Sequence, residues 1–176
     1  MALNAYLKLS GSKQGEIKGS VTQKGREGQI MVTATDHEVF YSKDPATGLP
    51  TGKRQHKPFR ITKDVDRSSP LLYMAMINNE DITTWELRFW TSSATGAEEQ
   101  YYTVKLTNAL ISDVVFHMPN TRNPDFSKYP ESEEIFFIYQ KIQWIWTDGD
   151  LSAQDDWGAF GQLRQRDAPQ TLEPHF

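Results

Sequence analysis

Histidine is the side chain that most often serves as a catalytic base or a metal ligand, and this sequence of 176 residues contains four. His37, His56, His117 and His175 lie far apart and show none of the short spacings of metal-binding motifs. Cysteine is absent, which excludes disulfides, thiolate metal sites and a cysteine nucleophile. Isolated histidines on strands are usually core or surface residues. The sequence therefore predicts no catalytic residue, no metal site and no cofactor.

Two other segments resemble catalytic or binding motifs. The run from Ser10 to Lys13 matches the SxxK spacing of penicillin-binding enzymes, but it lies in a predicted turn and lacks the partner motifs. The run from Gly48 to Lys53 resembles a phosphate-binding loop. It has one residue too few between its glycines, Arg54 where Ser or Thr is required, and no helix after it. Neither segment predicts a site.

Acidic residues gather at positions 98–99, 131–134 and 155–156. We expect these clusters to be solvated surface. Paired carboxylates could also serve a glycoside hydrolase, which would require an acid and a base that converge in a cleft. The sequence does not identify such a pair.

Net charge and hydropathy exclude several classes of partner. The net charge is −4 with 24% charged residues, which argues against a nucleic-acid binder, because such proteins neutralise phosphates. No window is long and apolar enough for a transmembrane helix. The N-terminal run MALNAYLKL lacks the basic and apolar regions of a signal peptide. We expect no membrane insertion and no export by a cleaved general signal.

One basic cluster stands out in the chain. It comprises Lys53, Arg54, His56, Lys57 and Arg60. One interpretation is a solvated base of a loop. The alternative is an electrostatic docking point for an acidic surface on a partner or on another copy of the chain.

The basic cluster follows a segment rich in proline and glycine, Lys43 to Lys53. Residues at this density of proline and glycine form neither a helix nor a central strand. Strand-like segments flank it, so we expect a protruding hairpin loop. The candidate site residues in this loop and at its end are Lys43, Asp44, Pro45, Gly48, Leu49, Pro50, Gly52, Lys53 and Arg54.

The next segment combines a strand with the only convincing helix. Phe59, Ile61 and Val65 form the apolar side of the predicted strand. Ser68 and Ser69 can then cap a helix with a side-chain oxygen. Pro70 suits the first helical position, and the helix is predicted to run over residues 69–79.

This helix is apolar on all sides, whereas a surface helix normally shows one apolar stripe. The ten residues from Pro70 to Asn79 span about 15 Å, too short for a membrane. The helix must therefore be covered on more than one side, either by its own barrel or by another copy of the chain. We expect Leu72, Tyr73 and Met76 to form this packing surface.

Alternating apolar residues predict strands in the rest of the chain. They cover residues 5–9, 28–41 (one strand, or two joined by a bend near Asp36), 82–91, 100–106, 110–118 and 133–147. The last would extend about 50 Å, so it must bend across two sheets or reach beyond its own core. The sequence thus predicts a mainly β fold, barrel-like or of two antiparallel sheets, with one short flanking helix. A single domain is expected over residues 1–157, followed by a polar tail over residues 158–176.

Two blocks of this sequence occur together in a known family. The run ITKDVDRSSPLLYMA and the run YQKIQWIW, with GSV, REGQI and HEV before them and DDW after them, resemble the Hcp family. Hcp (haemolysin-coregulated) proteins are the tube proteins of the bacterial type VI secretion system. The resemblance covers residues 5 to 157.

This resemblance implies a structural protein without catalytic residues. Six copies would form a ring, and rings would stack head to tail into a hollow tube inside a contractile sheath. The implied partners are other copies of the chain, a VgrG-type spike protein, sheath proteins and small effectors in the lumen. Assembly would take place in the bacterial cytoplasm, followed by secretion without a signal peptide. The competing interpretations are a small-molecule-binding β-barrel and a β-sandwich glycoside hydrolase.

Overall fold

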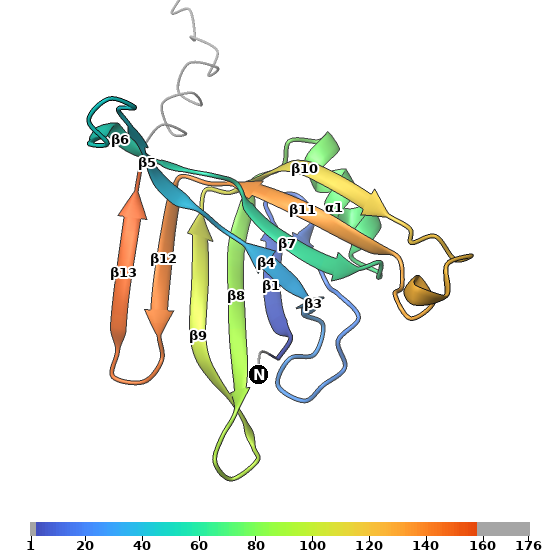
Figure 1. The fold of residues 1–176 in the computed structure, drawn as a ribbon. Coiled ribbons are helices and arrows are strands. Elements are labelled where there is room, and N and C mark those ends of the chain that lie inside the picture. The colour runs from blue at the N-terminus through green and yellow to red at the C-terminus, as the bar shows by residue number, and fades with distance from the viewer. Residues whose placement is uncertain (1–2, 158–176) are drawn as a thin grey trace, which may run out of the picture.

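The computed structural model describes residues 3–157 as a set of antiparallel sheets with one α-helix (Figure 1). Helix α1 covers Ser69–Ile77, and a 3₁₀ turn covers Pro124–Phe126. The strands are β1 (Ala5–Gly11), β2 (Gly15–Glu16), β3 (Ile30–Val32), β4 (Ala34–Asp36), β5 (Val39–Lys43), β6 (Pro50–His56), β7 (Phe59–Asp64), β8 (Ile82–Ser92), β9 (Glu98–Thr107), β10 (Leu110–His117), β11 (Ser132–Ile138), β12 (Lys141–Trp146) and β13 (Leu151–Asp156).

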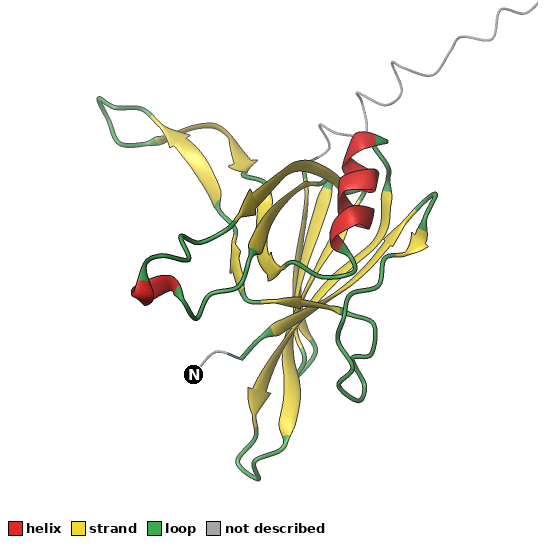
Figure 2. Ribbon diagram, turned by 90° about the vertical axis from the view of Figure 1, so that its right-hand side faces the viewer, coloured by secondary structure: helices red, strands yellow, loops and turns green. Residues whose placement is uncertain are grey.

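The strands form three sheets. The largest has the order β13-β12-β9-β8-β1-β2, and β3 also pairs with β1. A second sheet has the order β10-β11-β7-β4, and β5 and β6 form a separate pair. The two larger sheets face each other in an open, barrel-like arrangement (Figures 1 and 2). The predicted mainly β fold is confirmed.

The core lies between the two larger sheets. Trp85 of β8 contacts Phe59 of β7 and Phe137 of β11 edge to face, with ring centroids 4.9 and 5.5 Å apart. Leu7 and Leu87 of the large sheet and Ile61 and Ile135 of the smaller one are fully buried around them. Each of these residues sits on the inward side of an alternating strand, which is why the sequence pattern predicted strands.

The long strand predicted over residues 133–147 bends, and the first of its two expected alternatives is confirmed. Residues of β11 belong to the smaller sheet and those of β12 to the larger one. The inward positions are odd-numbered through Tyr139 and then switch to Ile142. The strict alternation expected across the whole segment is therefore wrong, because the corner at Tyr139–Gln140 shifts the inward side by one residue.

Helix α1 begins at Ser69 and ends two residues earlier than expected. The side-chain cap predicted for Ser68 is absent, since Ser68 makes no capping hydrogen bond. Instead Asp66 binds the start of the helix: its carboxylate accepts from the Ser68 amide at 2.9 Å and its carbonyl from the Ser69 amide at 3.0 Å. A carboxylate suits this position because helix N-termini carry positive partial charge.

Several other boundaries differ from the prediction. The segment 28–41 forms three strands, not one or two, because β3, β4 and β5 pair in three different sheets. Val65 lies beyond the end of β7 and is exposed, while Lys63 takes the inward position. Strand β13, which pairs along β12, was missed. The predicted tail over residues 158–176 lies outside the described residues.

Candidate functional site

The predicted protruding loop is a hairpin made by β5 and β6. Its turn is held by Asp44, whose carboxylate accepts from the Ala46 amide at 2.9 Å and the Thr47 hydroxyl at 3.0 Å. The hydrogen bond from Ala46 lowers the pKa of Asp44. Pro50 and the residues up to Lys53 belong to strand β6 and not to a loop. Proline is tolerated there because Pro50 is the first residue of an edge strand.

This hairpin extends away from the two larger sheets (Figures 1 and 2). Leu49 at its turn is 64% exposed, and Val39 and Tyr41 on β5 are also exposed. A two-stranded hairpin is marginally stable in water by itself. The geometry thus presents an apolar tip on a projection that requires support at its base.

The support comes from a group of side chains that we call the hairpin clamp. It comprises Arg54 and His56 of β6, Tyr139, Asp155 of β13, and Trp157. Arg54 donates two hydrogen bonds to the carboxylate of Asp155. His56 lies between Asp155, 2.7 Å from Nε2, and the Tyr139 hydroxyl, 2.9 Å from Nδ1. Its ring stacks on Trp157 with centroids 5.4 Å apart.

The clamp alters the acidity of its members. The hydrogen bonds from Arg54 lower the pKa of Asp155 to about 2. Burial raises the pKa of Tyr139. The neighbouring His37 lies 2.5 Å from the Tyr139 hydroxyl, and its burial, followed by repulsion from His56, lowers its pKa to about 4. At neutral pH a carboxylate and a guanidinium thus join the hairpin to β13.

Helix α1 is the second candidate contact surface. Leu72 is fully buried against the core, so this residue packs on the chain's own barrel. Tyr73 and Met76 are partly exposed, and Ile77 is 76% exposed. The chain's own barrel therefore covers the side of the helix that carries Leu72. The opposite side presents a band of large apolar side chains to solvent.

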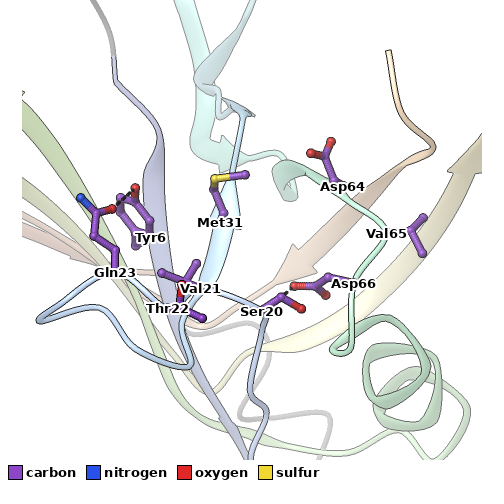
Figure 3. Close-up of a pocket in the computed structure, with 9 residues that line it drawn as sticks. All are labelled: Tyr6, Ser20, Val21, Thr22, Gln23, Met31, Asp64, Val65 and Asp66. Atoms are coloured by element: carbon purple, nitrogen blue, oxygen red, sulfur yellow. Dashed lines mark hydrogen bonds between the residues drawn. The ribbon is translucent and has the colours of Figure 1, made fainter. Parts of the chain in front are cut away.

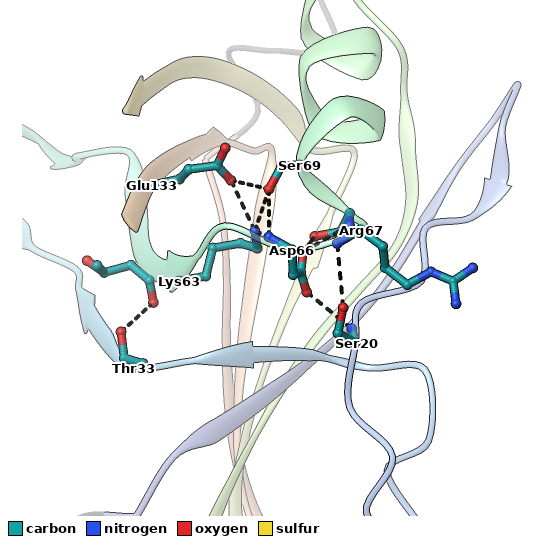
Figure 4. Close-up of polar contacts among 9 residues, drawn as sticks. Ser20, Thr33, Lys63, Asp66, Arg67, Ser69 and Glu133 are labelled. Carbon is teal, nitrogen blue, oxygen red and sulfur yellow. Dashed lines mark hydrogen bonds and ion pairs between the residues drawn. The ribbon is translucent and has the colours of Figure 1, made fainter. Parts of the chain in front are cut away.

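The base of the helix is fixed by a buried polar group, the Lys63 cluster: Lys63, Asp66, Ser69 and Glu133 (Figure 4). The Lys63 ammonium donates to Glu133 and Asp66 at 3.0 Å each and to the Ser69 hydroxyl at 3.1 Å. Ser69 in turn donates to Glu133 at 2.8 Å. Burial favours a raised pKa for Asp66, but the hydrogen bonds from Ser68 and Lys63 outweigh it and lower that pKa.

The prediction that the acidic clusters are solvated surface is wrong for Glu133 and Asp155, whereas Glu98, Glu99, Glu131 and Asp156 are exposed as expected. Glu133 and Asp155 are held by Lys63 and Arg54, and Glu98 pairs with the buried Arg26 at 2.6 Å. Sequence reasoning missed Lys63, although its position two residues after the inward Ile61 was a usable signal. It also missed Tyr139 and Trp157 as partners of the hairpin. Within residues 3–157 no group of three or more His, Asp or Glu side chains could hold a metal ion.

Sequence comparison identifies the family. The model of the family described as "Type VI secretion system effector, Hcp" matches residues 6–146. The chain belongs to the Hcp family. It is also 39% identical over 166 residues to the major exported protein of Pseudomonas aeruginosa, covering 89% of this chain and 96% of the relative.

Solved Hcp structures share the fold. The Hcp1 protein of Escherichia coli EAEC 042, a mutant form, has 34% identity and a TM-score of 0.78, over 88% of this chain and 99% of that one. Secreted protein Hcp3 of P. aeruginosa has 32% identity and a TM-score of 0.71, over 89% and 99%. The residues that match the family model, 6–146, include both the hairpin and helix α1. In the part of the chain that is described, no helix is long and apolar enough to cross a membrane.

Proposed function

We propose that this Hcp chain is a structural subunit of the inner tube of a type VI secretion system. Six copies form a ring, rings stack into a hollow tube, and sheath contraction propels the tube out of the cell. Its partners are other copies of itself, a VgrG-type spike protein, the sheath and small effectors in the lumen. The observation that carries the proposal is that one chain of this family presents two apolar surfaces that it does not cover itself.

The outward side of α1 supports ring formation. Tyr73, Met76 and Ile77 are too large and too apolar a group to be left in water without a partner. A closed ring joins two different patches of each subunit, so each copy can cover the helix of its neighbour. The Lys63 cluster anchors the first turn of this helix, which presents the surface in one orientation.

The hairpin supports the stacking of rings. It projects at one end of the molecule, and its lysines Lys43 and Lys53 have no side-chain partner among residues 3–157. Arg54 is already engaged by Asp155, so its contribution to stacking is to hold the hairpin as well as to add charge. No step of this role requires a catalytic residue or a cofactor.

Electron microscopy and native mass spectrometry of the purified protein test the proposal. We expect rings of six copies. The variant Met76→Asp places a charge in the outward band and should abolish rings while it leaves the fold intact, because Met76 is partly exposed. Met118→Asp, the same change at an exposed position outside the helix, is the matched control and should retain rings.

Charge reversal at Lys53 and Arg54 separates ring formation from stacking. That double variant should form rings as the natural chain does and stack more weakly. A monomeric natural chain, or rings that persist in Met76→Asp, would contradict the assignment of the helix. Unchanged stacking in the charge-reversed variant would contradict the assignment of the hairpin.

A further inference from the structure

The hairpin of β5 and β6 joins the rest of the molecule through two short breaks in the strand pairing. Strands β4 and β7 pair with each other in the smaller sheet, and β5 and β6 pair with each other in the hairpin. Between these pairs, residues 37–38 and residues 57–58 belong to no strand, and both connections run from the smaller sheet to the hairpin (Figure 1). Pro58 has no backbone N–H with which to continue the pairing. Segments that end a strand in this way can act as a hinge.

One hydroxyl group holds both connections. Tyr139 lies at the corner between β11 and β12 and is almost completely buried. Its oxygen is 2.5 Å from Nε2 of His37, in the first connection, and 2.9 Å from Nδ1 of His56, which ends β6 beside the second. Phe59 and Trp144 pack on the His37 ring with centroids 5.1 and 6.3 Å away. We call His37, His56 and Tyr139 the hairpin hinge.

The partners of these groups assign the direction of each hydrogen bond. The Asp155 carboxylate is ionised at neutral pH and can only accept, so His56 donates to it from Nε2. A neutral His56 then accepts at Nδ1, and the Tyr139 hydroxyl donates to it. The Tyr139 oxygen in turn accepts from Nε2 of His37. This chain of hydrogen bonds is complete when both histidine rings are neutral.

Charged and titratable groups surround His37, but their own pairing leaves little to stabilise a proton on its ring. Besides Tyr139 and His56, the groups that border the hollow of about 630 Å³ beside His37 are Asp36, Glu38, Lys57, Arg60 and Asp113. Arg60 binds Asp36, and Lys57 binds Glu38. Asp113 accepts from the Ser112 hydroxyl at 2.7 Å. Burial, followed by repulsion from His56, accordingly lowers the pKa of His37 to about 4.

We propose that the hairpin hinge is acid-sensitive: protonated His37 leaves Tyr139 for water, and the hairpin turns away from the barrel while the two larger sheets stay folded. His37 can leave because it is half-buried and belongs to no strand. Arg54 still binds Asp155, which keeps the hairpin tethered to β13. The hinge does not require ring formation. In the proposed tube it makes the orientation of the hairpin depend on pH.

Proton linkage sets the size of the effect. The pKa of His37 is 6.5 in water and about 4 beside Tyr139, so the open form binds the proton first as the pH falls. This difference limits the increase in the ratio of open to closed hairpin to about a hundredfold between pH 7 and pH 4. Solvent screens a half-buried ring, so we expect an increase of at least about tenfold.

Amide hydrogen exchange read by mass spectrometry measures this ratio in the natural chain. A hairpin that loses the support at its base is marginally stable, so its amides exchange from the open form. After correction for the intrinsic rate at each pH, the opening constant of residues 37–57 should rise at least about tenfold from pH 7 to pH 4. Strands β8 and β9 form a second hairpin without these histidines, and their opening constants should change less than about twofold.

Two variants separate the proton from the hydrogen bond. His37→Gln keeps an N–H for the Tyr139 oxygen but cannot titrate, so the opening constant of the hairpin should not respond to acid. Tyr139→Phe keeps the buried ring and removes the hydroxyl that holds both connections. In that variant the hairpin should exchange rapidly at pH 7 and at pH 4 alike.

Asp64→Asn is the matched control. Asp64 ends β7, five residues from Phe59 and about 16 Å along the strand from the hinge. Its carboxylate lies beside Val65 and across from Met31 in a separate hollow (Figure 3). This change removes a titratable group without touching the hinge, and the variant should keep the full acid response.

The outcomes decide the hinge independently of the tube function. No increase in hairpin exchange by pH 4, an equal increase in β8 and β9, or an undiminished response in His37→Gln would overturn it. A response that is lost in His37→Gln, replaced by rapid exchange at both pH values in Tyr139→Phe and kept in Asp64→Asn establishes it. None of these results depends on whether the chain forms rings, which microscopy tests separately.

Discussion

The Lys63 cluster and the hairpin clamp both contain an ion pair that holds a proposed contact surface in place. Each attaches one of the proposed contact surfaces to the sheets through a cation and a carboxylate. Lys63 and Glu133 lie opposite each other on the paired strands β7 and β11 and bind Ser69 of the helix, and Arg54 of the hairpin binds Asp155 of β13. They differ in burial. The Lys63 and Glu133 side chains are almost completely buried, whereas 41% of the Arg54 side chain is exposed.

This difference determines what each device can do. An ion pair removed from water must be complete, since an unpartnered buried charge is costly. The three N–H groups of the Lys63 ammonium accordingly have three acceptors, in Ser69, Asp66 and Glu133. These contacts hold the helix in one orientation. A pair open to water is weaker and exchanges with solvent. The hairpin is therefore held by a contact that can yield when a neighbouring copy docks.

The largest effect is expected from Lys63→Ala. Removal of the ammonium leaves the Glu133 carboxylate buried without a counter-ion, and the free energy of unfolding should fall by about 3–5 kcal/mol. Urea denaturation followed by tryptophan fluorescence measures it. A loss below about 1 kcal/mol would mean that water enters this cluster. The buried and the exposed ion pair would then not differ in the way described.

Replacing both charged residues of the pair by neutral ones tests whether the cost comes from the unpaired buried charge. The double variant Lys63→Met and Glu133→Gln removes both charges and keeps similar volumes, so it should lose only about 1–2 kcal/mol. Ser69 keeps a hydrogen-bond partner in the glutamine. If the double variant is as unstable as Lys63→Ala, the cost arises from packing and not from the buried charge.

In the hairpin clamp, Asp155→Asn should be less destabilising than Lys63→Ala at pH 7, and its effect should depend on pH. The pKa of Asp155 is lowered from 3.8 to about 2, so its stabilising contribution is complete above about pH 4 and is lost as the pH falls toward 2. Unfolding free energies of the two proteins should converge over that range. Parallel curves from pH 6 to pH 2 would count against the clamp.

His37 beside the clamp should give a smaller effect in a different pH window. Its folded pKa of about 4 lies below the ordinary 6.5, so the unfolded chain binds its proton first as the pH drops. The natural protein should therefore lose stability between pH 6.5 and 4, and His37→Gln should flatten this part of the profile. The histidine resonances followed by NMR would give the pKa independently, and a value near 6.5 would refute the prediction.

The smallest effect is expected from Lys57→Ala, at the same hairpin base. Lys57 pairs with Glu38 at 2.6 Å, but more than half of each side chain is exposed. Pairs of this kind contribute less than about 0.5 kcal/mol and weaken with salt. Thermal unfolding at low and high salt measures this. A loss of stability comparable to that of Asp155→Asn would show that solvent exposure does not determine how much each ion pair stabilises the protein.

The amino-acid sequence by itself determined most of the local structure. Alternating apolar residues predicted β1, β7, β8, β9 and β10 to within about two residues at most of their ends. The apolar run after Pro70 predicted α1, and proline and glycine between Lys43 and Lys53 predicted the hairpin. These signals are visible because they depend on neighbours along the chain.

The tertiary structure decided which polar residues meet. Arg54 and Asp155 are 101 residues apart, and Lys63 and Glu133 are 70 residues apart, so no local pattern links them. Strand β13 was missed for the same reason: most of its residues are polar or exposed and show no apolar alternation, and it exists because β12 offers an edge with which to pair. The corner at Tyr139–Gln140 brings β12 and β13 to the hairpin. Asp155, which the sequence places in an ordinary acidic pair, thus becomes a partner of Arg54 and His56 only because the fold brings distant strands together.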